Sequence, residues 1–600
     1  MNLILYLTKI SLKTWAYLLI LILTISFFIS VGDPLSFTGD EPRYVYYAHS
    51  YANEGIFVGN LENWYEYLKE SGQSPIDPNN GSTKPGHSIV IPFIISPFTK
   101  ILKLNELRIL SSITGILGGM LLFFLIKKLT FSHKIALFIS IICTITIPVL
   151  PYFETLFSDI WLFTGVTAAS LLLVFSKQRI QKSKFNFLII VPSFFFFLIF
   201  LHIRLLPVSA VFSAFFYLYI FKSNFKIQKK FLVHSIFFLI LVLVGFSIYQ
   251  LSIFGSLTGS ASSPYTPSLI GIFERLAIQL FEMRHGLLVY SPFYLFSFIG
   301  FILAVSNKKE FALEFLFALI GMILVFIWGA ASESFPGRFW VATIPLLAIG
   351  LAYWFILPKR WFTWIPFWIF LFLGLINTYI YIHHTNAFLE NRIFSYTYDL
   401  LFSDFNLFNF SAFLPWDEFG IVDALMNKSH IIALWMLIIS LVFIATIIIS
   451  LSKSKVLSIF GILINLSLIF FLMAFMYVKP LGKSEFTANP YIENNYQVLV
   501  ITLSTPTNLS VVRFGEPRYY WPTPIYPSHL WIECSFDGVN YIEKFQVRAT
   551  PTIAIQCNFP VKTLRITSNT SDTRLFYSHS LELYKKPRLA RIAHSISKLF

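Results

Sequence analysis

The sequence predicts a mainly α-helical, polytopic membrane protein of about thirteen spans, followed by a small extracytoplasmic β domain. Three observations predict this fold class. Hydrophobic residues make up 56% of the 600 residues and charged residues only 12%, whereas globular proteins have about 45–50% and about 25%. Many apolar runs reach the roughly 20 residues that a helix needs to cross a bilayer. Beyond residue 480 these runs give way to short alternating ones.

The first apolar run, Leu12–Val31, has no small-residue cleavage site after it and is interpreted as a retained signal anchor. The expected spans lie near 12–32, 107–127, 134–150, 160–176, 185–201, 205–221, 231–252, 289–305, 311–330, 339–356, 361–381, 431–452 and 456–478. The expected outer loops are 33–106, 151–159, 253–288, 331–338 and 382–430. Residues 86–102 are apolar but short and interrupted by prolines, so we expect a helix in the outer interface rather than a span.

The net charge is +15, and the basic residues are distributed according to the alternation of inner and outer loops. Basic residues gather in every second loop, as at Lys127–Lys128, 177–184 and Lys308–Lys309. Loops rich in lysine and arginine face the cytoplasm. The pattern therefore predicts an inner-membrane protein with a cytoplasmic amino terminus and a periplasmic carboxyl-terminal domain. It also argues for membrane lipid, and against nucleic acid, as a partner.

Residues 1–480 are expected to form the membrane domain and 481–600 a β-sandwich. Runs such as "YQVLVITLST" alternate, and Asp537-Gly538 in "SFDGVNY" predicts a hairpin turn. The surroundings of this turn weakly resemble carbohydrate-binding jelly rolls, and a structural cap is the alternative. Cys534 and Cys557 fall on expected strands, where an oxidising compartment permits a disulfide, although spacing leaves the bridge open. The basic tail lies on headgroups or is solvated.

The sequence contains no Walker loop, Rossmann glycine pattern, nucleophile elbow or CxxC cluster. Nucleotide and thiol chemistry therefore lose support. Polar residues gather instead in the expected outer loops. They are Asp40, Glu41, Glu154, Asp159, His202, Arg204, Glu282, Arg284, His285, Glu333 and Arg338. A carboxylate can take a proton from an acceptor hydroxyl, and arginine or histidine can hold a phosphate. Taken singly, each could instead be a snorkelling side chain or half of a structural ion pair.

Several blocks, in order, resemble the GT-C membrane glycosyltransferases, which include protein O-mannosyltransferases and aminoarabinose transferases of lipid A. The stretch Asp40-Glu41-Pro42-Arg43-Tyr44 is similar to the acidic motif of their first outer loop. Later blocks that resemble theirs are "KPGHSIVIPFIISPF", "RILSSITGILGGMLLFFLIKKLT", "LFSDIW", "LFEMRHGLLVYSPFYL" and "WGAASESFPGRFWVATIPLL". The likeness covers residues 10–360 or so and leaves out the β domain. Phe157-Ser158 lacks the usual Tyr-Pro before Asp159, and Phe339-Trp340 stands where Arg-Tyr is usual.

The resemblance implies an inverting transfer of a sugar from a polyprenyl-phosphate donor to a glycan, lipid or protein acceptor at the outer face. It implies that Asp40 is the general base or the carboxylate that orients the acceptor, and that Asp159 is a second acidic residue lining the same cavity. Glu41 is a further catalytic candidate that could instead bind a metal, contact the acceptor or only cap a helix. The implied residues for the donor phosphate are Lys84, His87, Arg284 and Arg338. Further candidate substrate-binding residues, from their place at the expected outer face, are Arg43, Tyr44, His202 and Arg204. Tyr44 and Tyr47 lie one helical turn apart, which favours packing over sugar contact. Some relatives bind a divalent metal, but a DxD-type cluster is missing here, so neither a metal nor another cofactor is expected.

Other functions stay open. A membrane polymerase or ligase of lipid-linked glycans would place its catalytic residues in a late outer loop, here 382–430. A non-enzymatic transporter or flippase of lipid-linked sugars would show internal repeats and broken helices with ionisable groups near mid-membrane. A third possibility is a silent receptor that binds its ligand with the β domain.

Overall fold

The chain divides into two compact units, Met1–Leu389 and Glu390–Phe600. In the first, the computed structural model describes residues 11–31, 41–71, 85, 88–179, 185–223, 225–254, 276, 279–280, 286–328, 338–357 and 364–383. In the second, it describes 479–480, 483–493, 496–514, 529–548, 552–555, 557, 559–568 and 581–585. The expected spans 431–452 and 456–478 lie outside these residues, as do the loop 382–430 from residue 384 onward and the basic tail.

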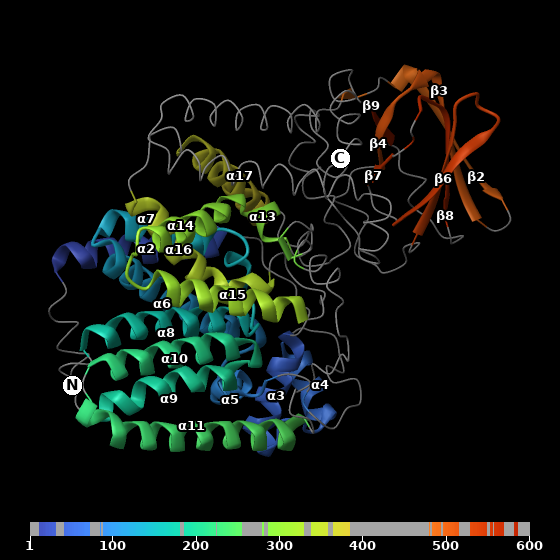
Figure 1. Cartoon of the computed structure of the whole chain (residues 1–600). Coiled ribbons are helices and arrows are strands. Elements are labelled where there is room, and N and C mark those ends of the chain that lie inside the picture. The colour runs from blue at the N-terminus through green and yellow to red at the C-terminus, as the bar shows by residue number, and fades with distance from the viewer. Residues whose placement is uncertain are drawn as a thin grey trace, which may run out of the picture. The chain divides into compact units, whose positions relative to one another are not determined.

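The described part of the first unit is helical (Figure 1). Its longest helices are α2 (Leu12–Val31), α6 (Leu104–Thr130), α8 (Asp159–Arg179), α10 (Leu206–Ser223), α11 (Phe225–Phe254) and α17 (Trp364–His383). Shorter ones are α3 (Glu41–Glu54), α4 (Leu61–Glu70), α5 (Val90–Ile95), α7 (His133–Ile145), α9 (Phe185–Leu201), α13 (Leu287–Tyr290), α14 (Leu295–Ser306), α15 (Ala312–Trp328) and α16 (Ile344–Ile356). Between them lie the 3-10 turns η1 (Ser96–Lys100), η2 (Leu150–Glu154), η4 (Ile203–Leu205), η5 (Pro292–Tyr294) and η6 (Arg338–Thr343).

Among the described residues, 5 helices are long and apolar enough to cross a membrane. They are Leu12–Ser30, Glu106–Thr130, Asp159–Lys177, Ile203–Lys222 and Arg338–Ile356. Six further expected spans coincide with shorter apolar helices: His133–Ile145, Val191–Leu201, Ile240–Phe254, Pro292–Ser306, Ala312–Val325 and Trp364–Tyr379. A mainly helical protein with membrane-type helices is thus confirmed, whereas the count of thirteen spans stays a prediction. Residues 86–102 contain the short helix Val90–Lys100, whose place in the interface also stays a prediction.

The helices pack closely where small residues meet. A Cβ atom added to Gly300 of α14 would lie 2.0 Å from the carbonyl oxygen of Gly350 on α16. A Cβ atom on Gly350 would in turn lie 2.4 Å from the carbonyl oxygen of Ser297. Close backbone approach at small residues is typical of helix pairs in membranes. Helix α11 exposes Phe237, Ile248 and other large apolar side chains, and α2, α6, α15 and α17 also expose such side chains, as expected of helices that face lipid.

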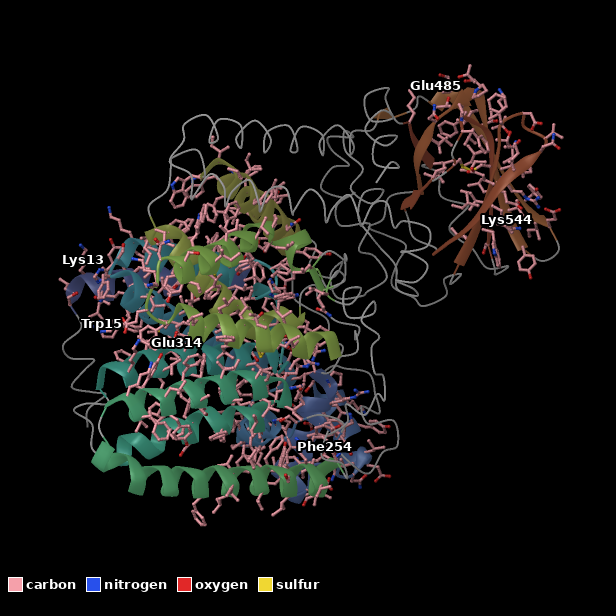
Figure 2. All side chains as sticks on the ribbon, viewed as in Figure 1. Lys13, Trp15, Phe254, Glu314, Glu485 and Lys544 are labelled. Carbon is pink, nitrogen blue, oxygen red and sulfur yellow. A yellow bond between two sulfur atoms is a disulfide. The ribbon has the colours of Figure 1, made fainter. Side chains whose placement is uncertain are left out.

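The two ends of the helix bundle carry different side chains. At one end, Lys127 of α6 donates to the Thr14 hydroxyl of α2 over 2.9 Å, and Lys177 of α8 pairs with Glu310 over 3.2 Å. Figure 2 shows Lys13 and Glu314 at this end and Phe254, the last residue of α11, at the other. Helices α8, α10, α9 and α11 lie in that order in a row, each running between the two ends (Figure 1). The first residues of α6 and α8 therefore lie at the end away from these lysines.

The described residues of the second unit form two antiparallel sheets. One has the strand order β1 (Lys479–Pro480), β9 (Leu581–Lys585), β4 (Leu509–Phe514) and β7 (Thr552–Ala554). The other has the order β2 (Phe486–Glu493), β3 (Tyr496–Thr507), β8 (Val561–Ser568), β5 (His529–Ser535) and β6 (Tyr541–Arg548). Both contribute to one apolar core, with Val512 and Leu583 from the first sheet and Ile501, Ile532 and Ile566 from the second. The strands expected from alternation are confirmed as antiparallel sheet.

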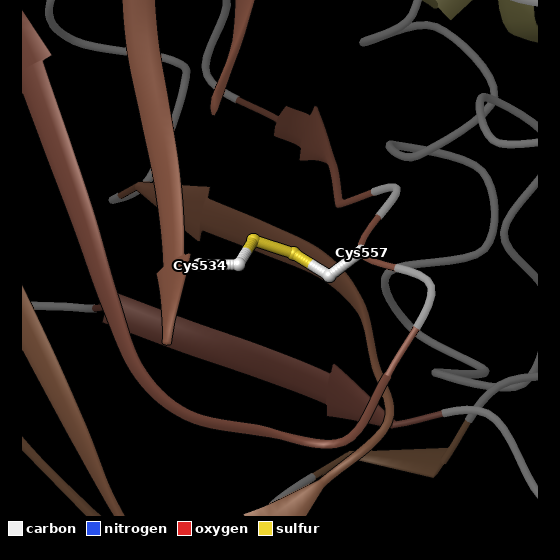
Figure 3. Close-up of a disulfide and its surroundings, with 2 residues drawn as sticks. All are labelled: Cys534 and Cys557. Atoms are coloured by element: carbon white, nitrogen blue, oxygen red, sulfur yellow. A yellow bond between two sulfur atoms is a disulfide. The ribbon is translucent and has the colours of Figure 1, made fainter. Parts of the chain in front are cut away.

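A disulfide joins Cys534 at the end of β5 to Cys557, with Cα atoms 6.4 Å apart (Figure 3). The predicted hairpin turn links β5 to β6. Its Asp537 carboxylate accepts hydrogen bonds from the backbone N–H groups of Asn540 and Val539, and these bonds hold the pKa of Asp537 well below its usual range. Gly538 has φ +88°, a left-handed conformation that favours glycine.

Candidate functional site

The residues predicted to act on substrate fall into two groups. Asp40, Lys84, His87 and Arg284 lie outside the described residues, as do Glu282, His285 and Glu333. The described ones are Glu41, Arg43, Tyr44, Asp159, His202, Arg204 and Arg338. Their positions show which of the predicted residues are brought together.

Glu41 begins α3 and makes a buried ion pair with Arg108 in the first turns of α6. The Arg108 Nε atom donates to Glu41 Oε1 over 2.8 Å, and an Nη atom donates to Oε2 over 2.7 Å. The backbone N–H of Leu156 also donates to Oε1, over 3.1 Å. The Glu41 side chain is 0% exposed. A carboxylate in the first turn also interacts favourably with the positive end of its own helix. Glu41 thus anchors α3 to α6 and to the chain before α8.

Asp159 begins α8 and pairs with Arg338, the first residue of η6. The Arg338 Nε atom donates to Asp159 Oδ2 over 2.9 Å, and the two side chains are only 5% and 2% exposed. The Arg338 guanidinium also lies over the Phe157 ring, 4.7 Å from its centroid. The predicted second acid and a predicted phosphate-binding arginine are therefore in direct contact.

The turn η4 brings Arg204 to Phe339, the residue after Arg338 in the chain, and His202 directly precedes this turn. The Arg204 guanidinium lies over the Phe339 ring, 4.4 Å from its centroid. The imidazole of His202 caps the turn η4, since its Nδ1 accepts a hydrogen bond from the Arg204 backbone N–H over 3.1 Å. Arg204 thus contacts Phe339, the residue that follows Arg338 in η6.

The segment Glu154–Asp159, which precedes and begins α8, connects the two ion pairs. Leu156 donates to Glu41, Phe157 lies under Arg338, and Asp159 bonds Arg338. Glu154 is partly buried, and burial raises its pKa to about 7, an effect that the nearby charge of Arg108 opposes. Burial disfavours the charged form of a carboxyl group, so Glu154 can exchange a proton near neutral pH.

Two further polar groups of this region are buried. Thr155 Oγ1 and Trp161 Nε1 make no hydrogen bond within the described part of the chain. Buried polar groups are nearly always paired, so an unpaired one suggests a partner that the described residues do not supply. The hydroxyl and the indole N–H lie on either side of Asp159 in the sequence. They could bind a polar ligand at this end of the bundle.

Arg43 and Tyr44 lie on α3 with Glu41. Arg43 is half-buried. Tyr44 and Tyr47 are 1% and 0% exposed, which places both rings inside the protein. Their burial fits the packing interpretation of their spacing.

Arg108 and the Leu156 N–H were missed by sequence reasoning. Arg108 stands in the block "RILSS", near the start of an apolar run. A single cation there was a usable signal, because charged side chains within membrane helices are costly and generally paired. The Leu156 N–H had no sequence signal, because every residue except proline carries such a donor.

Among the described residues, no group of three or more His, Cys, Asp or Glu side chains could hold a metal ion. Asp40 lies outside this search, so the metal question stays open for that part of the site. No protein-family model matches the sequence, and no curated protein matches it either.

Proposed function

We propose that the protein is a membrane glycosyltransferase of the GT-C type, which transfers a sugar from a polyprenyl-phosphate donor to an envelope glycan, lipid or protein. The observation that carries the proposal is the pair of buried carboxylate–arginine contacts, Glu41–Arg108 and Asp159–Arg338, at one end of the bundle. The proposal includes the finer topology, with about thirteen spans, a cytoplasmic amino terminus and an outer-face reaction centre.

Both buried ion pairs carry an energetic cost. Taking an ion out of water costs several kcal/mol, and apolar replacements of buried ion pairs are often neutral or stabilising. Two such pairs, joined by the short segment Glu154–Asp159, are therefore poorly explained by stability alone. Ionisable groups inside membrane proteins mark substrate pathways more often than structural sites.

Each residue takes a role that fits its contacts. Asp40 directly precedes Glu41 in the chain, and consecutive Cα atoms across a trans peptide are about 3.8 Å apart. Because Glu41 is held by Arg108 and Leu156, it positions the start of α3 and hence Asp40, the proposed base. Asp159 orients Arg338 rather than transferring a proton, since its carboxylate already accepts from that guanidinium.

The proposed reaction is a single displacement at the anomeric carbon. Asp40 takes the proton of the acceptor hydroxyl while the hydroxyl oxygen bonds to that carbon. The bond from carbon to the phosphate oxygen breaks, and its electron pair leaves with the polyprenyl phosphate. Arg338 and Arg204 stabilise the negative charge that develops on this leaving group. The transfer inverts the configuration of the sugar.

Mass spectrometry of cell-envelope glycans tests the proposal. Cells that lack the gene should lose one defined sugar, and the wild-type chain should restore it. Asp40→Asn should fail to restore the sugar at equal protein level in the membrane, whereas Glu66→Gln, at an exposed position of α4, should restore it fully. Full restoration by Asp40→Asn would exclude the proposed mechanism. An unchanged sugar content combined with lipid-linked sugar accumulating on the cytoplasmic face would favour a flippase instead.

A further inference from the structure

The outward face of the five-stranded sheet carries aromatic side chains on three of its strands. Register places Tyr491 of β2, Val498 of β3, Thr567 of β8 and Trp531 of β5 side by side across the sheet. Neighbours of Trp531 along β5, Leu530 and Ile532, are buried in the core, so this row faces away from it.

Tyr496 adds a third aromatic ring to this face. Tyr496 begins β3, on the same face as Val498, and its ring centroid lies 6.5 Å from that of Trp531. Tyr491 and Tyr496 are 43% and 44% exposed. Aromatic side chains with a polar tip are enriched at binding surfaces, and a contiguous exposed apolar patch is typical of such a surface. We define Tyr491, Tyr496 and Trp531 as the aromatic platform.

A chain of ion pairs crosses the same face beside the aromatic platform. Arg565 of β8 pairs with Glu493 of β2 and lies 3.6 Å from Glu533 of β5. Glu533 in turn pairs with Lys544 of β6 over 3.1 Å. These ion pairs contain two carboxylates, one guanidinium group and one ammonium group, so the formal charges of the four groups sum to zero.

We propose that the aromatic platform binds a neutral saccharide. A pyranose ring has an apolar face of C–H bonds, which covers an aromatic ring, and a rim of hydroxyl groups, which bond to carboxylates and guanidinium groups. The cancelled charge favours a neutral ligand over a polyanion or an anionic lipid surface, which would need an excess of cations. The rings are interleaved with charged side chains, unlike the core of a protein interface, from which charged residues are depleted.

The binding test uses the full chain in a detergent without a sugar headgroup, because a glucoside or maltoside would compete. The probes are maltotetraose, cellotetraose, mannotetraose and N-acetylchitotetraose, measured by saturation-transfer NMR and by calorimetric titration. At least one should bind with a Kd below about 1 mM. Trp531→Ala should weaken that binding about tenfold or more, as for a buried aromatic anchor. Absence of binding by all four at about 10 mM would overturn the proposal.

Matched variants separate binding from folding. Tyr496→Ala removes an exposed ring at the start of β3 and should weaken binding in the same direction even if Trp531→Ala does not fold. Val539→Ala, at a 77% exposed position in the β5–β6 turn, should leave binding unchanged. Equal binding by wild type and Tyr496→Ala would count against the proposal. A changed oligomeric state of Tyr496→Ala in light scattering, with no change in saccharide binding, would make the face a protein interface instead.

This inference is independent of the proposed transfer reaction. Asp159→Asn alters the candidate site in the other unit and should leave oligosaccharide binding unchanged. If transfer fails in every assay while the platform still binds, the proposed function is wrong and this inference stands. If transfer proceeds but no saccharide binds the platform, only this inference fails.

Discussion

Asp159 and Arg338 illustrate how a single buried contact sets the properties of the candidate site. Removing one partner leaves the other charge buried and uncompensated, which typically costs about 3–5 kcal/mol. We therefore expect Arg338→Met to lower the thermal stability of the detergent-solubilised chain strongly. Asp159→Leu combined with Arg338→Met should recover most of that loss, because apolar replacement of both partners is often neutral.

A matched exposed pair provides the control for this experiment. Lys544→Met removes one partner of the pair with Glu533 in the β unit, where the lysine side chain is 62% exposed. Exposed pairs contribute about 0–1 kcal/mol, so this change should hardly affect stability. Equal losses of thermal stability in Lys544→Met and Arg338→Met would argue against a buried ion pair between Asp159 and Arg338.

Glu154 should make stability depend on pH. Its pKa lies at about 7 in the folded chain, against 4.5 for the ordinary side chain. Because the folded state binds the proton more tightly, the stabilisation is complete below pH 4.5 and is lost as pH rises through about 7. Glu154→Gln should therefore flatten the fall in melting temperature between about pH 5 and about pH 8. Glu66→Gln serves as the control, and an equally steep fall in Glu154→Gln would refute the assignment.

At the residue scale, the sequence predicted the polar partners better than their pairing. Asp159 and Arg338 were both candidates because charged residues beside apolar runs are conspicuous. Their contact depends on bringing η6 against the start of α8, over 179 residues of chain, and no local pattern encodes that distance. Arg108 was not predicted as a site residue because it lies within the expected apolar span 107–127.

At the scale of elements, the contact between α14 and α16 makes a specific prediction. Gly350→Ala should push the helices apart, because its Cβ atom would meet the Ser297 carbonyl oxygen at 2.4 Å. Overpacking of this kind costs about 1–3 kcal/mol, so the melting temperature should fall. Gly245→Ala on α11 is the matched control, since nothing lies within 4 Å of its added Cβ atom. It should be neutral or stabilise by about 0.5–1 kcal/mol through helix propensity. An unchanged melting temperature in Gly350→Ala would contradict the close packing of α14 against α16.

Helix positions were predictable where apolar runs are long, because length and hydropathy are local properties. The expected spans 107–127 and 160–176 fall within α6 (Leu104–Thr130) and α8 (Asp159–Arg179). The hairpin at Asp537-Gly538 was predictable for the same reason. The strand order was not, since β8 lies between β3 and β5, and β9 pairs with β4. Such non-local pairings depend on the whole domain.

For the molecule as a whole, the disulfide should contribute to the stability of the β unit. It closes a loop with a sequence separation of 23 residues. Bridges over loops of this size stabilise by about 3 kcal/mol, mainly by restricting the unfolded chain. Cys534→Ser with Cys557→Ser should therefore lower the unfolding transition of the β unit, followed by its near-UV circular dichroism. Cys143→Ser, which removes the buried free thiol of α7, is the control for loss of a sulfur atom. An unchanged transition in the double variant would contradict the prediction.

The long chain separation between Asp159 and Arg338 also has a consequence for synthesis. Ribosomes add about 5–20 residues per second, so a gap of 179 residues corresponds to roughly 10 to 35 s. Glu41 and Arg108, 67 residues apart, are both made within a shorter interval. The Glu41 pair can thus assemble first, while Asp159 is made well before its arginine. The candidate site on a translating ribosome is therefore incomplete, and it becomes whole only after η6 has been made.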